Sequence, residues 1–90
     1  MLTSTDEYRG HVTSNVLFAG SQEEVCHILD LAMKDLDLHE TNKATTIIFT
    51  DKILDELDHF NPMNKNAQEW SNINMARIYF HRIKLHDTVQ

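Results

Sequence analysis

Two pairs of residues have the types and the spacing that a metal site requires. Glu24 and His27 stand three residues apart, and Glu56 and His59 repeat this spacing. Residues three apart on a helix share a face, and a Glu-x-x-His pair on each of two facing helices can hold two metal ions between them. The pairs therefore raise the hypothesis of a dinuclear metal site, which depends on the direction in which each helix points them.

The composition favours helices as the elements that carry these pairs. The 90 residues include only two glycines and one proline, whereas an all-β domain needs turn residues about every 8–12 positions. The hydrophobic fraction of 41% suffices for a globular core. A chain of this length forms one domain at most, so we predict a single helical domain over residues 1–90.

Apolar residues recur three or four positions apart in four segments, which is the spacing of amphipathic helices. We therefore predict the all-α class, as a small antiparallel helical bundle of three to four helices, at about 5–18, 22–37, 42–59 and 63–86. The β-branched residues near 12–18 and 45–50 leave an alternative open, an α+β fold with a short strand in each of these two segments.

Turn and capping residues separate the predicted helices. The stretch SQEE at 21–24 fits the S-x-x-E capping box, in which Ser21 and Glu24 satisfy free backbone N–H groups at a helix start. Gly20 fits the position just after the end of the first helix. Asn61 and Pro62 fit the start of the last helix, because asparagine is a good cap and proline suits the first helical position.

The direction of each Glu-x-x-His pair follows from about 100° of rotation per helical residue. In the helix at 22–37, the apolar stripe includes Val25 and Leu29. Glu24 falls about 100° and His27 about 160° from the centre of this stripe. The first pair therefore faces away from the predicted core, and Glu24 is explained as the closing residue of the capping box.

The second pair gives the same result. In the helix at 42–59 we place the centre of the apolar stripe between Ile47 and Leu57, and Glu56 and His59 both fall more than about 130° from it. An interior dinuclear site is therefore rejected. Glu56 and His59 remain weak candidates for a metal site on the surface, and we predict that the protein holds no metal and needs no cofactor.

No residue pattern in the sequence predicts catalysis. Cys26 and His27 are adjacent, so on a helix they point about 100° apart and cannot form the hydrogen bond of a thiolate–imidazole dyad. Phosphate-binding loops, nucleophile elbows and His-Glu-x-x-His motifs are absent from the sequence. We therefore predict that the protein is not an enzyme and that Cys26 packs at the edge of the core.

The net charge of −6 is unevenly distributed along the chain. Residues 21–60 carry ten acidic residues against three lysines, a net charge of −7, whereas residues 61–90 carry a net charge of +2. Acidic residues that face solvent suit contact with a basic partner. We predict that an acidic surface binds another protein through these residues: Asp51, Asp55, Glu56 and Asp58.

The last predicted helix is apolar on two sides. One face includes Ile73 and Phe80, and a second face is centred about 160° around the helix from it. Tryptophan and arginine are enriched at protein interfaces. We predict that the first face packs inside the monomer and that the second forms a homodimer interface with these residues: Trp70, Ile78, Arg82 and Leu85.

These features together predict a small acidic regulatory, adaptor or inhibitor protein that acts by protein–protein binding. One alternative is a nucleic-acid-binding protein that uses the helix at 63–86, where Arg77, Arg82 and Lys84 alternate with aromatic residues; the net negative charge opposes it. A second alternative is a metal-binding or small-ligand-binding helical module. The sequence has no apolar run of membrane-spanning length and no signal-peptide pattern, so we expect a cytoplasmic protein without membrane contact.

Overall fold

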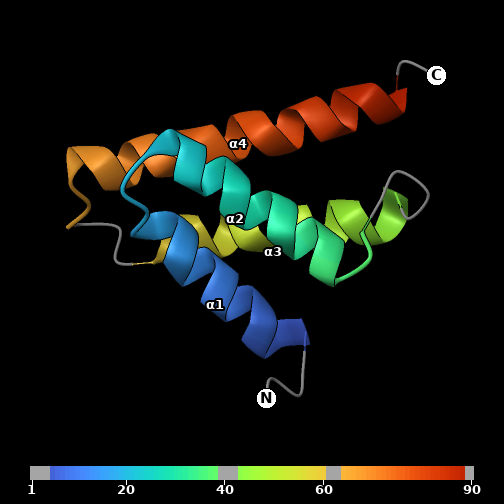
Figure 1. The fold of residues 1–90 in the computed structure, drawn as a ribbon, viewed down its shortest axis with the longest axis horizontal. Coiled ribbons are helices and arrows are strands. Elements are labelled where there is room, and N and C mark those ends of the chain that lie inside the picture. The colour runs from blue at the N-terminus through green and yellow to red at the C-terminus, as the bar shows by residue number, and fades with distance from the viewer. Residues whose placement is uncertain (1–4, 39–42, 61–63, 89–90) are drawn as a thin grey trace.

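The structure is a computed structural model, and it describes residues 5–38, 43–60 and 64–88, except for the side chains of Thr5, Lys43 and 84–88. Within these ranges the regular structure is entirely helical. The helices are α1 (Thr5–Leu17), α2 (Gln22–Asp35), α3 (Lys43–His59) and α4 (Ala67–Thr88) (Figure 1). The predicted all-α fold is confirmed. The strand alternative is wrong, because both β-branched segments are helical, one in α1 and the other in α3.

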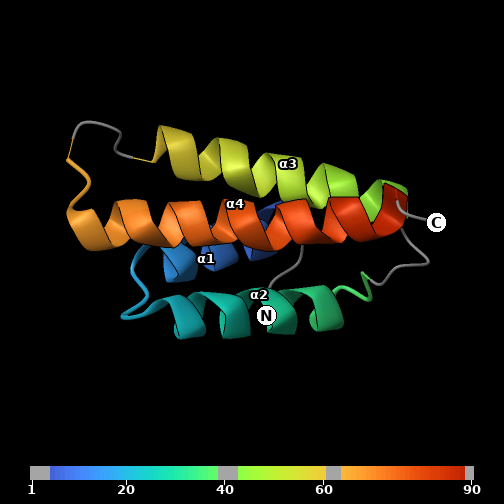
Figure 2. The same ribbon diagram turned by 90° about the horizontal axis from the view of Figure 1, so that it is seen from above.

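Helices α1 and α4 form the central pair of the bundle. Each of them packs against the other three helices, whereas α2 and α3 hardly touch. The ribbon views show α1 and α4 running antiparallel, with α2 on one side of this pair and α3 on the other (Figures 1 and 2). The chain therefore forms two helical hairpins, α1–α2 and α3–α4, and each extensive contact between the hairpins involves α1 or α4.

Each helix contributes one apolar stripe to a shared core. The predicted stripes of α1 and α2 and the inner face of α4 are confirmed, because their apolar side chains are buried where the three-or-four spacing placed them. The buried hydrophobic residues are Val12, Val16, Leu17, Ala19, Val25, Leu29, Ala32, Leu38, Phe49, Ile53, Leu57, Ile73, Ala76 and Phe80.

The start of α2 has the predicted capping residues. Ser21 has extended backbone geometry, and its hydroxyl accepts a hydrogen bond from the Glu24 N–H at 3.2 Å. The Glu24 carboxylate accepts a hydrogen bond from the Gly20 N–H at 2.6 Å. Two N–H groups at this helix start are therefore satisfied by side chains, as in a capping box, although the second belongs to the residue before Ser21.

The start of α4 differs from the prediction. The helix begins at Ala67 rather than near residue 63, and Asn66 caps it. The Asn66 side-chain oxygen accepts a hydrogen bond from the Glu69 N–H at 2.8 Å, and the Glu69 carboxylate accepts one from the Asn66 N–H at 2.9 Å. This reciprocal pair is a complete capping box four residues beyond the predicted start. Asn61 and Pro62, the predicted start signal, lie outside the described residues.

Helix α2 ends in a Schellman motif built on an aspartate. Asp37 has a φ of 55°, in the left-handed region. The Leu38 N–H donates to the Met33 carbonyl at 2.7 Å, and the Asp37 N–H donates to the Lys34 carbonyl at 3.1 Å. These two bonds satisfy carbonyl groups that a helix end otherwise leaves free. The turn also returns the chain to the core, where Leu38 is buried.

A side chain of α4 caps the end of α1. Asn72 is fully buried, and its amide nitrogen donates to the carbonyls of Leu17 at 3.1 Å and Ala19 at 2.9 Å. Its oxygen accepts a hydrogen bond from the Gln68 amide at 2.8 Å. Gly20, which we expected to terminate this helix, does not have a positive φ. The buried amide thus satisfies two carbonyls at the end of α1 and just after it, where no left-handed glycine turns the chain.

The buried face of α3 is not the predicted one. Ile47 and Ile48 are exposed, whereas Thr46 and Thr50 are buried beside the apolar core. A threonine hydroxyl can bond to a carbonyl of its own helix, so burying it costs less free energy than its polarity suggests. Because Ile47 and Ile48 were counted as core residues, the centre of the apolar stripe was predicted at the wrong angle around the helix axis. Helix α3 is therefore rotated about its axis relative to the predicted orientation.

Candidate functional site

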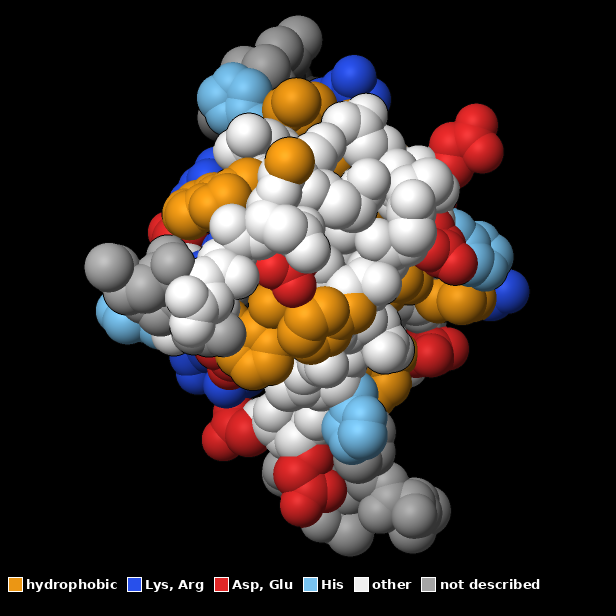
Figure 3. Space-filling model, turned by 90° about the vertical axis from the view of Figure 1, so that its left-hand side faces the viewer, with side chains coloured by type: hydrophobic (Ala, Val, Ile, Leu, Met, Phe, Trp, Pro, Cys, Tyr) orange, Lys and Arg blue, Asp and Glu red, His pale blue; other side chains and the backbone are white. Residues whose placement is uncertain are grey.

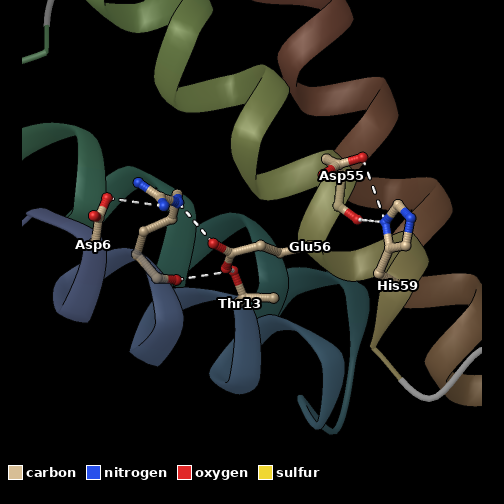
Figure 4. Close-up of polar contacts among 6 residues, drawn as sticks. Asp6, Thr13, Asp55, Glu56 and His59 are labelled. Atoms are coloured by element: carbon tan, nitrogen blue, oxygen red, sulfur yellow. Dashed lines mark hydrogen bonds and ion pairs between the residues drawn. The ribbon is translucent and has the colours of Figure 1, made fainter.

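The rotation of α3 turns Glu56 toward α1 rather than toward solvent. The Arg9 Nε donates to the Glu56 carboxylate at 2.8 Å, and the Thr13 hydroxyl lies 2.9 Å from its other oxygen (Figure 4). Arg9 also pairs with Asp6 at 3.0 Å, and only 12% of the Arg9 side chain is exposed. Glu56 is half-buried in this contact. Its predicted place on the acidic outer surface is therefore wrong.

His59 lies on a different side of α3 from Glu56 and contacts Asp55 (Figure 4). Its Nδ1 is 2.8 Å from the Asp55 carbonyl oxygen and 3.4 Å from the Asp55 carboxylate. The hydrogen bond to the backbone of Asp55, followed by the charge of its carboxylate, raises the pKa of His59 above its ordinary value. Because Glu56 is hydrogen-bonded to residues of α1, Glu56 and His59 are not placed to bind the same metal ion.

The first Glu-x-x-His pair is also divided between two environments. Glu24 takes part in the cap of α2, while His27 is exposed on the same helix. Across the described part of the chain, no three histidine, cysteine, aspartate or glutamate side chains gather into a group that could hold a metal ion. In both Glu-x-x-His pairs, therefore, the glutamate and the histidine lie in different environments.

Three of the four predicted partner-binding acids lie on the exposed side of α3. Asp51, Asp55 and Asp58 are exposed and are spaced four and three residues apart, so they share one face of the helix. Asp58 forms an ion pair with Arg77 of α4, which compensates part of its charge. The exposed acids therefore form a smaller and less charged surface than the sequence predicted.

The predicted second face of α4 points away from the bundle. We define the outer face of α4 by five exposed residues: Ala67, Trp70, Asn74, Ile78 and His81. Trp70 is 41% exposed and Ile78 45% exposed, whereas Ile73 and Phe80 on the opposite face are buried. Arg82 is also exposed. The side chain of Leu85, the fourth predicted interface residue, lies outside the described ones.

The arginines of α4 are less available than the sequence suggested. Arg77 pairs with Asp58 and lies 3.4 Å from the Asn74 side-chain oxygen. Arg82 is exposed, and the side chain of Lys84 lies outside the described ones. The pairing of Arg77 weakens the positive field on which nucleic-acid binding by this helix would depend.

Two phenylalanines at one end of the bundle form a contact that the apolar spacing did not predict. Phe18 follows α1 and Phe60 follows α3, and their rings meet edge to face with centroids 6.0 Å apart. Each stands two residues before a chain-breaking residue, Gly20 or Pro62. Since antiparallel hairpins place such breaks at the same end of a bundle, this repeated spacing was the signal that could have predicted the contact.

Among the residues described, no helix combines the length and the apolar character needed to cross a membrane. No protein-family model matches the chain, and no curated protein or solved structure is significantly similar to it.

Proposed function

We propose that the protein acts by binding other proteins, as a small acidic regulatory or adaptor protein, and that the outer face of α4 is its homodimer interface. The observation that carries this proposal is the exposure of Trp70 and Ile78 on a helix whose opposite face is already buried in the core. A helix with two apolar sides is stable in water when both sides are covered. A second copy of the chain supplies the missing cover.

The spacing on this face suits a two-fold symmetric pair. Asn74 lies midway between Trp70 and Ile78, four residues from each. If two α4 helices cross antiparallel at Asn74, Trp70 of each copy packs against Ile78 of the other, and the two Asn74 amides meet at the symmetry axis. A symmetric dimer requires such self-complementarity, and a polar residue at the centre fixes the register.

Solution mass measurement tests the dimer. Light scattering across a dilution series is expected to show a dimer for the wild type and a monomer for Ile78→Glu, because a buried, unpaired carboxylate opposes association. Leu31→Glu is the matched control, since Leu31 on α2 is also 45% exposed but lies on another helix. A wild type that is monomeric at every concentration contradicts the proposed dimer, and so does equal behaviour of the two variants.

The exposed acids of α3 are proposed to meet a basic surface on the partner protein. Asp51 and Asp55 are exposed on this helix. Affinity capture with Asp51→Lys/Asp55→Lys is expected to recover less partner than the wild type, because the reversed charges repel a basic surface. Glu7→Lys/Glu23→Lys, at exposed positions of α1 and α2, changes the net charge by the same amount and is the control. Unchanged recovery with the double variant would remove these acids from the proposal.

A further inference from the structure

The end of the bundle that carries the Phe18–Phe60 contact exposes both aromatic rings to solvent. Phe18 is 63% exposed and Phe60 38% exposed. Figure 3 looks onto this end, where hydrophobic side chains gather near the centre of the face among polar and acidic ones. Two large apolar side chains that touch each other and still face solvent form a patch suited to a binding partner.

A hollow with a volume of about 230 Å³ opens beside these rings, and a lysine reaches into it. Its lining residues are Leu17, Phe18, Phe60, Lys65 and Glu69. The Lys65 ammonium lies 5.1 Å from the centroid of the Trp70 ring, in a cation–π contact. This nitrogen is buried, and among the residues described none accepts a hydrogen bond from it.

An unpaired buried ammonium is costly, because it loses its hydration without gaining hydrogen bonds. The Trp70 ring covers only one side of it and accepts no conventional hydrogen bond. Glu69 also lines the hollow, but its carboxylate accepts a hydrogen bond from the Asn66 N–H in the cap of α4. A carboxylate that enters the hollow would pair with Lys65 once the ammonium turns from the Trp70 ring toward the hollow, where the aromatic rings shield the pair from water.

We propose that this hollow is a docking site for a segment of a partner protein in which an aspartate or glutamate adjoins a bulky apolar side chain. The carboxylate would bind the Lys65 ammonium, and the apolar side chain would cover Phe18 and Phe60. The hollow has room for about one side chain, so the exposed rings around it are covered only by a longer segment. This site goes beyond the proposed dimer, because it lies at the bundle end and does not use Ile78, although Trp70 borders both surfaces.

Fluorescence of Trp70 can report binding directly, because it is the only tryptophan of the chain. The probes are two capped peptides, acetyl-Ala-Leu-Glu-Phe-Ala-amide and the same peptide with Gln in place of Glu. At low salt the Glu peptide is expected to bind about fivefold more tightly, as for a partly shielded ion pair. Equal affinity for the two peptides, or no binding of either, would overturn the proposal.

Three variants assign the binding to this site. Lys65→Met keeps an apolar stem but removes the charge, so it is expected to abolish the difference between the two peptides. Phe18→Ser is expected to weaken both peptides alike, whereas Leu31→Ser, at an exposed leucine outside the hollow, is expected to weaken neither. A preference for Glu that survives in Lys65→Met would place the peptide elsewhere and reject the site.

The outcome is separate from that of the dimer test. The peptide titration is repeated with Ile78→Glu, in which the outer face of α4 is blocked, and the same peptide preference is expected. Loss of peptide binding in that variant, together with loss of the dimer, would show that the peptide needs the paired α4 helices and would overturn an independent site at the bundle end.

Discussion

Two tyrosine hydroxyls donate to aspartates of α2 and bind it to its neighbours. Tyr8 of α1 donates to Asp35 at 2.7 Å, and Tyr79 of α4 donates to Asp30. Burial, followed by the hydrogen bond to Asp35, raises the pKa of Tyr8 to about 12, and burial with the Asp30 contact raises the pKa of Tyr79 as well. These are the only tyrosines of the chain, so a phenolate titration reports these two groups alone.

The raised pKa values predict a loss of stability at alkaline pH. Because the folded state holds each phenolic proton more tightly, the contribution of Tyr8 is complete below its ordinary pKa of 10.0 and is lost as pH rises toward about 12. Absorbance titration is expected to show little phenolate at pH 10 in the native protein. Half-ionised tyrosines at that pH would contradict the prediction.

A single substitution separates the causes of the Tyr8 shift. Asp35→Asn removes the carboxylate charge but not the burial that contributes most. The pKa of Tyr8 is therefore expected to fall only part of the way toward its ordinary value, while that of Tyr79 stays unchanged.

At the residue scale, local contacts were predictable from the sequence and distant ones were not. The Ser21–Glu24 cap joins residues three apart, so its spacing could be recognised directly. The Arg9–Glu56 ion pair joins residues 47 apart, and no local pattern distinguishes Arg9 from an ordinary exposed arginine. The same is true of Asn72, whose partners precede it by more than fifty residues.

At the scale of the helices, Asn72 is the residue that connects the end of α1 to α4. Asn72→Asp keeps the size of the side chain but removes both donors to the carbonyls of Leu17 and Ala19. Denaturant unfolding is expected to show a loss of at least about 3 kcal/mol in the free energy of unfolding, because two carbonyls lose their donors and a carboxyl group replaces an amide at a fully buried position.

Asn15 provides the control for this substitution. It is an exposed asparagine on α1, and Asn15→Asp is expected to change the free energy of unfolding by less than about 0.5 kcal/mol. Similar effects of the two substitutions would mean that the added charge, rather than the lost hydrogen bonds, determines stability at these positions.

The orientation of α3 shows what periodicity alone cannot predict. Periodicity counts Ile47 and Ile48 as buried and threonines as polar, although in the bundle both assignments are reversed. On α1 and α2 the exceptions, a buried Thr13 and an exposed Leu31, do not shift the centre of the apolar stripe, so the predicted faces are confirmed. The wrong prediction for Glu56 has the same cause, because the direction of its side chain was measured from the wrongly placed centre of the α3 apolar stripe.

At the scale of the whole molecule, the arrangement of the helices predicts cooperative unfolding. Since α1 and α4 come from different hairpins and each contacts all other helices, neither hairpin has a complete core alone. Unfolding by urea is expected to give the same midpoint by helical circular dichroism and by Trp70 fluorescence. A fluorescence transition well before the loss of helix would show that the α3–α4 hairpin separates first.

The marginal contact between α2 and α3 has a consequence for chain connectivity. Those two helices are consecutive in sequence, yet they lie on opposite sides of the central pair and contribute almost nothing to each other's burial (Figure 2). The covalent link between them therefore raises the local concentration of two complementary halves. Fragments ending at Leu38 and beginning at Lys43 are two matching pieces, which makes the protein suited to split-reporter complementation.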